Sequence, residues 1–193
     1  MTGLAAEALM SRVAQAPLPD WRVFVQAISV SRVAAGASVF RPGDKDRRIF
    51  IVRSGLIKLV YSLPDGDEWI KSFIPEEKFF ACSSTLQSGA AAGFGAEAME
   101  PSELEHCPFS VLETLASLHI EWAKTLNALL LDFAAKKEER ERVFLTMKPA
   151  DRFVWLKSTM PRLIDRVPQK DLAAYLGVTP VGLNRIIKRL EKN

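Results

Sequence analysis

The spacing of apolar residues changes at Pro108, and this change constrains the fold more than any other feature of the sequence. From about residue 32 to residue 107, short runs of strand-forming residues alternate with turn signals. In LVYSLPDGDEWI, for example, Asp65-Gly66 supplies the positive φ of a tight hairpin turn between two such runs. Roughly six to eight short strands so closely spaced indicate a β-sandwich or a jelly-roll barrel. After Pro108 the periodicity is helical and stays so.

The helical parts lie on both sides of the strand-rich region. Apolar residues recur at helical spacing over 4–16, PLPD ends that pattern, and a second short helix is expected around 21–28. A short helix is predicted over 109–118 and a long one over about 119–147, where TMKPAD ends it. Further helices follow to the end of the sequence.

The long helix carries a heptad seam whose first half is apolar and whose second half is basic. Its members are Trp122, Leu126, Leu129, Phe133, Lys136, Arg140, Val143 and Met147. A helix of about 29 residues is about 43 Å long, which is longer than one small barrel. We therefore predict that the first four residues of this seam form a parallel homodimer contact. The alternative is that this face lies on the chain's own barrel.

Charge is distributed unevenly along the chain. Residues 1–135 contain 12 Lys or Arg and 16 Asp or Glu, whereas residues 136–193 contain 14 and 7. A basic C-terminal third favours a module that binds a polyanion, and a solvated helix surface explains the same charges equally well.

Several classes of protein are excluded by what the sequence does not contain. Cys82 and Cys107 are too few for a disulfide framework, a four-thiolate zinc site or a cysteine-ligated iron–sulfur cluster, so we expect no metal and no cofactor. A secretion signal, an apolar run of membrane-spanning length and an enzyme motif are all lacking. We therefore expect a cytoplasmic protein that is not an enzyme and has no membrane partner.

The segment PQKDLAAYLGVTPVGLNRIIKRL, residues 168–190, predicts two short helices around a tight turn. Gly177 tolerates the positive φ of the turn, and Thr179-Pro180 pairs an N-cap hydroxyl with proline at the first helical position. With Leu183 and Ile186 facing inward, a polar basic stripe remains outside. This pattern is typical of a helix-turn-helix, although any helical hairpin could share it.

Six residues of this segment are candidate DNA contacts. Arg185 can pair with guanine and Asn184 with adenine in the major groove. The phosphate contacts are expected from Lys170, Thr179, Lys188 and Arg189.

Together, GASVFRPGD, IFIVRSGLIKLV, the long seam helix and RVPQKDLAAYLGVTPVGLNRIIKRL resemble the Crp/Fnr family of bacterial transcription regulators, over nearly the whole chain. The resemblance implies an α+β fold with a cyclic-nucleotide-binding-like jelly-roll barrel and N-terminal helices (1–118), a dimerisation helix (119–147) and a helix-turn-helix domain lacking a full wing (148–193). It implies a homodimer that senses an effector and binds palindromic DNA. RNA polymerase is a further expected partner.

Two departures from the family pattern matter for function. Cyclic-nucleotide-binding relatives carry G-E-[LIV]-A and then an arginine that holds the cyclic phosphate. The alignment puts Phe80 and Ala81 at the Gly-Glu positions and Ala92 at or near the arginine, and no Lys or Arg occurs between Lys78 and Lys124. A buried phosphate would lack its counter-charge, so we expect no response to cyclic AMP or cyclic GMP.

The second departure is in the recognition helix, where the family presents R-E-x-x-x-R. The aligned residues here are Pro180, Val181 and Arg185, so only the last arginine is kept. This predicts a different operator or weaker sequence discrimination. It also leaves an alternative function, a sensor or interaction protein that keeps the scaffold but does not bind DNA.

An apolar effector pocket between the barrel and the long helix is a further hypothesis. Its candidate lining is Phe73, Phe79, Phe80, Cys82, Phe94 and Trp122. Because aromatic clusters usually pack in cores, core packing is the preferred interpretation of these residues.

Overall fold

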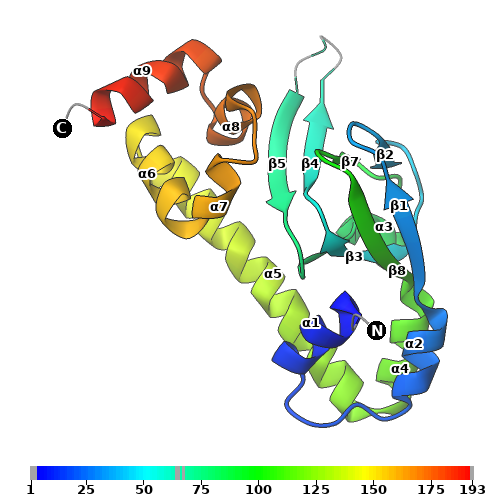
Figure 1. The fold of residues 1–193 in the computed structure, drawn as a ribbon. Coiled ribbons are helices and arrows are strands. Elements are labelled where there is room, and N and C mark those ends of the chain that lie inside the picture. Colours follow the sequence, from blue (N-terminus) through cyan, green and yellow to red (C-terminus); the bar gives the residue numbers. More distant parts are fainter. Residues whose placement is uncertain (1–3, 64–65, 67, 192–193) are drawn as a thin grey trace.

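The strand-rich part of the chain forms two four-stranded antiparallel sheets (Figure 1). The computed structural model describes residues 4–191 apart from 64, 65 and 67. One sheet has the order β1-β8-β3-β6 and the other β2-β7-β4-β5. The strands are β1 (Ser29–Val33), β2 (Ser38–Phe40), β3 (Arg48–Ser54), β4 (Ile57–Ser62), β5 (Glu68–Ile74), β6 (Phe79–Phe80), β7 (Gly95–Ala98) and β8 (Ser102–Pro108).

The core between the sheets is largely aromatic. The rings of Phe50 and Phe80 stack with their centroids 5.2 Å apart, and Phe40 and Phe94 meet edge to face at 5.6 Å. A short helix, α3 (Ser83–Ser88), which the sequence did not predict, interrupts the strands between β6 and β7. The predicted β-barrel of jelly-roll type is confirmed.

The predicted hairpin is confirmed as the antiparallel pair β4–β5, which runs from Ile57 opposite Ile74 to Ser62 opposite Glu68. Asp65 of the expected turn lies outside the described residues. Gly55, between β3 and β4, has a φ of 94°, and a side chain there would meet the backbone of Ser102 at 2.8 Å. Glycine is therefore required at this position both for the backbone angle and for the close approach of β8, which begins at Ser102.

Three short helices and the first half of the long helix cover one end of the barrel. They are α1 (Ala5–Val13), α2 (Trp21–Ala27), α4 (Phe109–Leu118) and α5 (Ile120–Thr146). Trp122 of α5 is fully buried there, with Trp21 stacked on it at 6.1 Å and Phe24 edge-on at 5.3 Å. Its indole N–H donates to the carbonyl of Pro19 at 2.7 Å, so the buried ring has no unsatisfied donor.

The structure corrects the predicted direction of the α5 seam. Trp122 and Leu129 are buried and Leu126 is half-buried against α1, α2 and α4, while Phe133 meets the ring of Phe79 at 6.5 Å. These four side chains face their own chain because its N-terminal helices and barrel cover that face. The exposed apolar side chains of α5 lie elsewhere, and they include Ile120, Leu130 and Leu131.

The remaining helices pack on the outer side of β5 (Figure 1). They are α6 (Pro149–Thr159), α7 (Pro161–Ile164), α8 (Gln169–Leu176) and α9 (Pro180–Leu190). Their core includes Leu156 and Leu176, and it is continuous with Ile70 and Phe73 of the barrel.

An ion-pair network ties these helices to the barrel. The Arg166 guanidinium donates to both carboxylate oxygens of Glu76, at 3.0 and 2.8 Å, and to Glu100 at 2.6 Å. These hydrogen bonds lower the pKa of the Glu76 carboxyl below its usual value.

A buried carboxylate fixes α1 to the barrel. Glu105 of β8 is fully buried, and its two oxygens accept from the backbone amides of Ala5 and Ala6, at 2.9 and 2.8 Å. No side chain of the local sequence caps this helix, so Glu105 satisfies two of its free amides from a distant strand. The negative charge also lies at the positive end of the helix dipole.

We predict that Glu105→Gln lowers the free energy of unfolding by about 2 kcal/mol, because a glutamine oxygen can accept from one amide while its NH₂ faces the other donor. Urea unfolding followed by tryptophan fluorescence measures this. Glu103→Gln is the matched control, since Glu103 lies on the same strand and pairs with the exposed Arg32. An equal effect in both variants would show that Glu105 does not hold α1.

Candidate functional site: an exposed basic helix and a cavity beside the barrel

The turn between α8 and α9 has the geometry that the sequence predicts. Gly177 has a φ of 71°, and the amide of Val178 donates to the carbonyl of Ala173 at 3.0 Å. A side chain at Gly177 would lie 3.1 Å from the ring of Phe144, so space as well as backbone angle restricts this position. The turn thus holds α8 and α9 in a fixed relation.

The start of α9 is capped by Thr179. Its hydroxyl oxygen accepts from the amide of Gly182 at 3.1 Å, and Pro180 follows at the first helical position. Thr179 is exposed, and its hydroxyl hydrogen is left to donate outward. The cap explains why the helix begins at this residue.

One face of α9 is buried and the opposite face is polar. Leu183 is fully buried, and Ile186 and Ile187 pack against the same core. The exposed stripe of α9, as we name it, consists of Asn184, Arg185, Lys188 and Arg189, with Val181 at its beginning. Figure 1 shows α9 on the side of the C-terminal helices that is away from the sheets.

All six predicted DNA contacts are exposed, since Lys170 at the start of α8 and Thr179 are exposed as well. Within the described part of the chain, the three cations of the exposed stripe make no ion pair with a carboxylate. The stripe can therefore contact an external anion without first breaking an internal bond.

Two arginines join the end of α5 to α8. Arg152 of α6 donates to the carbonyl of Phe144, in the last turn of α5, at 2.8 Å and to that of Leu176, the last residue of α8, at 3.1 Å. Arg140 donates to the carbonyl of Tyr175 at 3.2 Å and to that of Ile70 at 3.0 Å. The helix-turn-helix is thus tied both to the long helix and to the edge strand of the barrel.

A cavity of about 1490 Å³ lies between β4, β5, the second half of α5 and the C-terminal helices. Three of the six predicted effector residues line it, namely Phe73, Phe79 and Phe80. The other three do not. Cys82 and Phe94 are buried between the sheets and Trp122 lies among the N-terminal helices, so the structure corrects the prediction of one pocket formed by all six.

The cavity also brings together residues that sequence reasoning missed. Lys71 of β5 faces it, with Lys137 and Arg140 of α5 on the opposite wall. The sequence does not distinguish Lys71 from an ordinary lysine of a strand, whose side chain is expected to face solvent. Its orientation follows from the way β4 and β5 pair.

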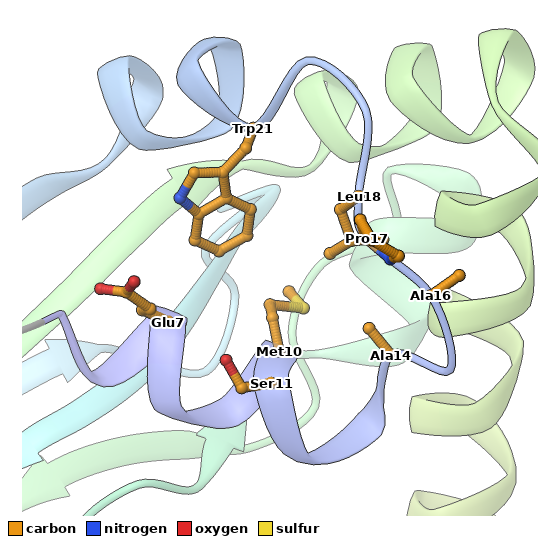
Figure 2. Close-up of a pocket in the computed structure, with 8 residues that line it drawn as sticks. All are labelled: Glu7, Met10, Ser11, Ala14, Ala16, Pro17, Leu18 and Trp21. Atoms are coloured by element: carbon orange, nitrogen blue, oxygen red, sulfur yellow. The ribbon is translucent and has the colours of Figure 1, made fainter.

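A smaller cavity, of about 340 Å³, opens between α1 and the segment that leads into α2 (Figure 2). Figure 2 shows Trp21, Met10 and Leu18 around it, with Glu7 at its edge. Glu7 is the one ionisable side chain among the residues that line this cavity. The lining gives no cluster of groups that would hold a charged ligand.

The segment aligned with the cyclic-nucleotide cassette supplies no cation. Phe80 ends β6, and Ala92, which is buried, exchanges backbone hydrogen bonds of 2.8 Å with the turn at Gly43 and Asp44. Residues 79–92 of this segment contain no lysine or arginine.

Two other kinds of site are absent from the part of the chain that the structure describes. None of its helices is long and apolar enough to cross a membrane. Among the same residues, no group of three or more His, Cys, Asp or Glu side chains is placed to hold a metal ion.

Comparisons with known proteins identify what the chain is similar to. Residues 30–119 match the cyclic nucleotide-binding domain family. The chain is 24% identical over 172 residues to the fumarate and nitrate reduction regulatory protein of Escherichia coli (strain K12), covering 83% of this chain and 68% of that protein. It is 24% identical over 173 residues to electron transport regulator A of Shewanella oneidensis, with the same coverage.

Solved structures share the fold. FixK2 from Bradyrhizobium japonicum superposes with a TM-score of 0.76 at 19% identity, over 86% of this chain and 85% of that one. The c-di-GMP responsive global regulator CLP from Xanthomonas campestris gives a TM-score of 0.70 at 18% identity, over 89% and 90%. The similar proteins are regulators, not enzymes.

Proposed function

Because this chain is a member of the Crp/Fnr family, we propose that it is a cytoplasmic transcription regulator that binds palindromic DNA as a homodimer without cyclic AMP. The observation that carries the proposal is the exposed stripe of α9, whose three cations are free of internal carboxylates among the described residues. A helix of this kind fits the major groove of DNA. Contact with RNA polymerase stays a prediction.

The division of roles along α9 follows from the chemistry of its side chains. Arg185 carries a guanidinium that can pair with two acceptors on guanine, and Asn184 can pair with adenine. Lys188 and Arg189 lie one turn further on and suit phosphate oxygens, as do Lys170 and the Thr179 hydroxyl.

The proposed dimer uses the exposed face of α5. Ile120 and Leu131 are 61% and 62% exposed, and their spacing of three turns puts them on the same side of the helix. Leu130, also exposed, adjoins them. Burying such a face against a second copy removes apolar surface from water and would set two α9 helices at a fixed spacing.

An alternative function is favoured by one observation. Val181 is 62% exposed within the stripe, at a position where the family presents a charged residue. A sensor or interaction protein that has lost base recognition would show this replacement. A gel shift against genomic fragments at rising salt separates the two, because specific retention supports the regulator and uniform weak binding supports the alternative.

We predict that Arg185→Ala weakens operator binding by about 1–3 kcal/mol and relaxes the preference at one base pair per half-site. Lys188→Ala should weaken binding to all sequences alike and reduce the slope of affinity against salt. Fluorescence anisotropy with the operator and single-base variants measures both. Equal losses on every sequence for both variants would contradict the assigned roles.

Leu131→Glu should convert the protein to a monomer, because it places two like charges in the proposed dimer contact. Sedimentation equilibrium measures the change, and operator affinity should fall with it. Val23→Glu is the control, since Val23 is also exposed but lies on α2. A Leu131→Glu protein that remains a dimer would exclude this face of α5.

Titration with cyclic AMP in a calorimeter should release no measurable heat, because the segment around Phe80 and Ala92 offers no counter-charge for the cyclic phosphate. Micromolar binding would show that the assignment of this segment is wrong.

A further inference from the structure

Three positive side chains, one from β5 and two from α5, line the large cavity. The ammonium of Lys71 lies 5.8 Å from the centroid of the Phe133 ring, and that of Lys137 lies 4.7 Å from the same ring. The guanidinium carbon of Arg140 lies 4.0 Å from the ring centroid of Tyr175. Cations gathered in this way repel one another, so the arrangement costs stability unless something negative lies between them.

A β-bulge turns Lys71 toward this cluster. Leu59 pairs with Ser72 and Val60 pairs with Ile70, which leaves Lys71 as the extra residue of β5. Its ammonium lies 4.7 Å from the ring centroid of Phe94. Bulges re-aim side chains and are frequent beside functional sites, and Lys71 is the residue that this bulge inserts.

The charges of the cluster are not balanced from within. Within the described part of the chain, no carboxylate lies within ion-pair distance of Lys71, Lys137 or Arg140. Four of the five acidic residues that line the same cavity pair with other cations: Glu76 with Arg166, Glu77 with Arg12, Asp132 with Lys136 and Glu139 with Arg142. Among the described residues, the fifth, Glu141, makes no ion pair with the three cations of the cluster.

The electrostatic consequence is largest at Lys71. Burial, and then the positive charges of Lys137 and Arg140, lower the pKa of its ammonium to about 8, while Cys82 acts in the opposite direction. Arg140 also has an unpaired hydrogen-bond donor. Its Nη2 donates to two carbonyls, whereas its Nη1 is buried and has no hydrogen-bond partner among the described residues.

We propose that Lys71, Lys137 and Arg140 bind the carboxylate of a small aromatic acid whose ring lies against Phe133. A monoanion is favoured over a phosphate dianion because it loses less hydration on entering a partly buried site. The site lies on β5 and α5, outside the β6–α3 segment aligned with the cyclic-nucleotide cassette. Ligand binding at this site does not require DNA, so it can be tested on the free protein.

Binding of benzoate, the probe, should be coupled to proton uptake. Near pH 8 about half of the Lys71 side chains are neutral, and a carboxylate beside them raises their pKa. Calorimetry at pH 8 in HEPES and in Tris, whose ionisation enthalpies differ, should give uptake of up to about half a proton per site. The groups facing Lys71 are Lys137, Arg140 and Cys82, so Cys82→Ser is titrated alongside.

The variant Lys71→Met keeps the length of the side chain and removes its charge. It should weaken benzoate binding about tenfold and abolish the proton uptake. Lys136→Gln is the matched control, because Lys136 neighbours Lys137 but pairs with Asp132, and it should bind as the unaltered protein does. Cys82→Ser should keep the proton uptake.

Four results would overturn the proposal. The first is the absence of saturable benzoate binding at millimolar concentration. The second is equal binding of the neutral analogue benzamide. The third is unchanged benzoate binding in a folded Lys71→Met protein. The fourth is tight binding of cyclic AMP through Lys71, which would assign these cations to a nucleotide phosphate.

Discussion

The C-terminal helices meet the end of α5 at one aromatic ring over which two guanidinium groups pack. The guanidinium carbons of Arg140 and Arg152 lie 4.5 and 4.6 Å from the ring centroid of Phe144, near the end of α5. Arg152 then satisfies the last carbonyls of α5 and α8, where helix ends would otherwise leave acceptors unpaired. The same ring orients both arginines. The end of α5, the turn at Gly177 and the start of α9 are therefore held in fixed positions relative to one another.

The opposite end of α5 is fixed by different chemistry. There Trp122 is enclosed by Trp21 and Phe24, and Glu105 draws α1 onto the barrel through two backbone amides. Apolar burial thus dominates the first half of the helix, and charged hydrogen bonds dominate the second. This difference was visible in the sequence as an apolar half followed by a basic half of the heptad seam.

The predictable part of the molecule is the part decided by local sequence. The turn at Gly177, the cap at Thr179 and the inward position of Leu183 follow from backbone preference and helical spacing, and each has the predicted geometry. The direction of the α5 seam was not predictable, because the partner of Trp122 comes from residues about a hundred positions away. Lys71 was missed for a similar reason, since a bulge depends on the register of two paired strands and leaves no trace in one of them.

The cavity and the exposed stripe of α9 are connected through Arg140. Its Nη2 already bridges the carbonyls of Ile70 and Tyr175, which are the residues beside Lys71 in β5 and near the end of α8. An anion that reached the unpaired Nη1 would add a bond to Arg140 without taking one from α8. A ligand that binds one arrangement better than another shifts the population toward it. Occupancy of the cavity would therefore favour the arrangement in which α8 is docked on the barrel, and it would act on α9 through the turn at Gly177.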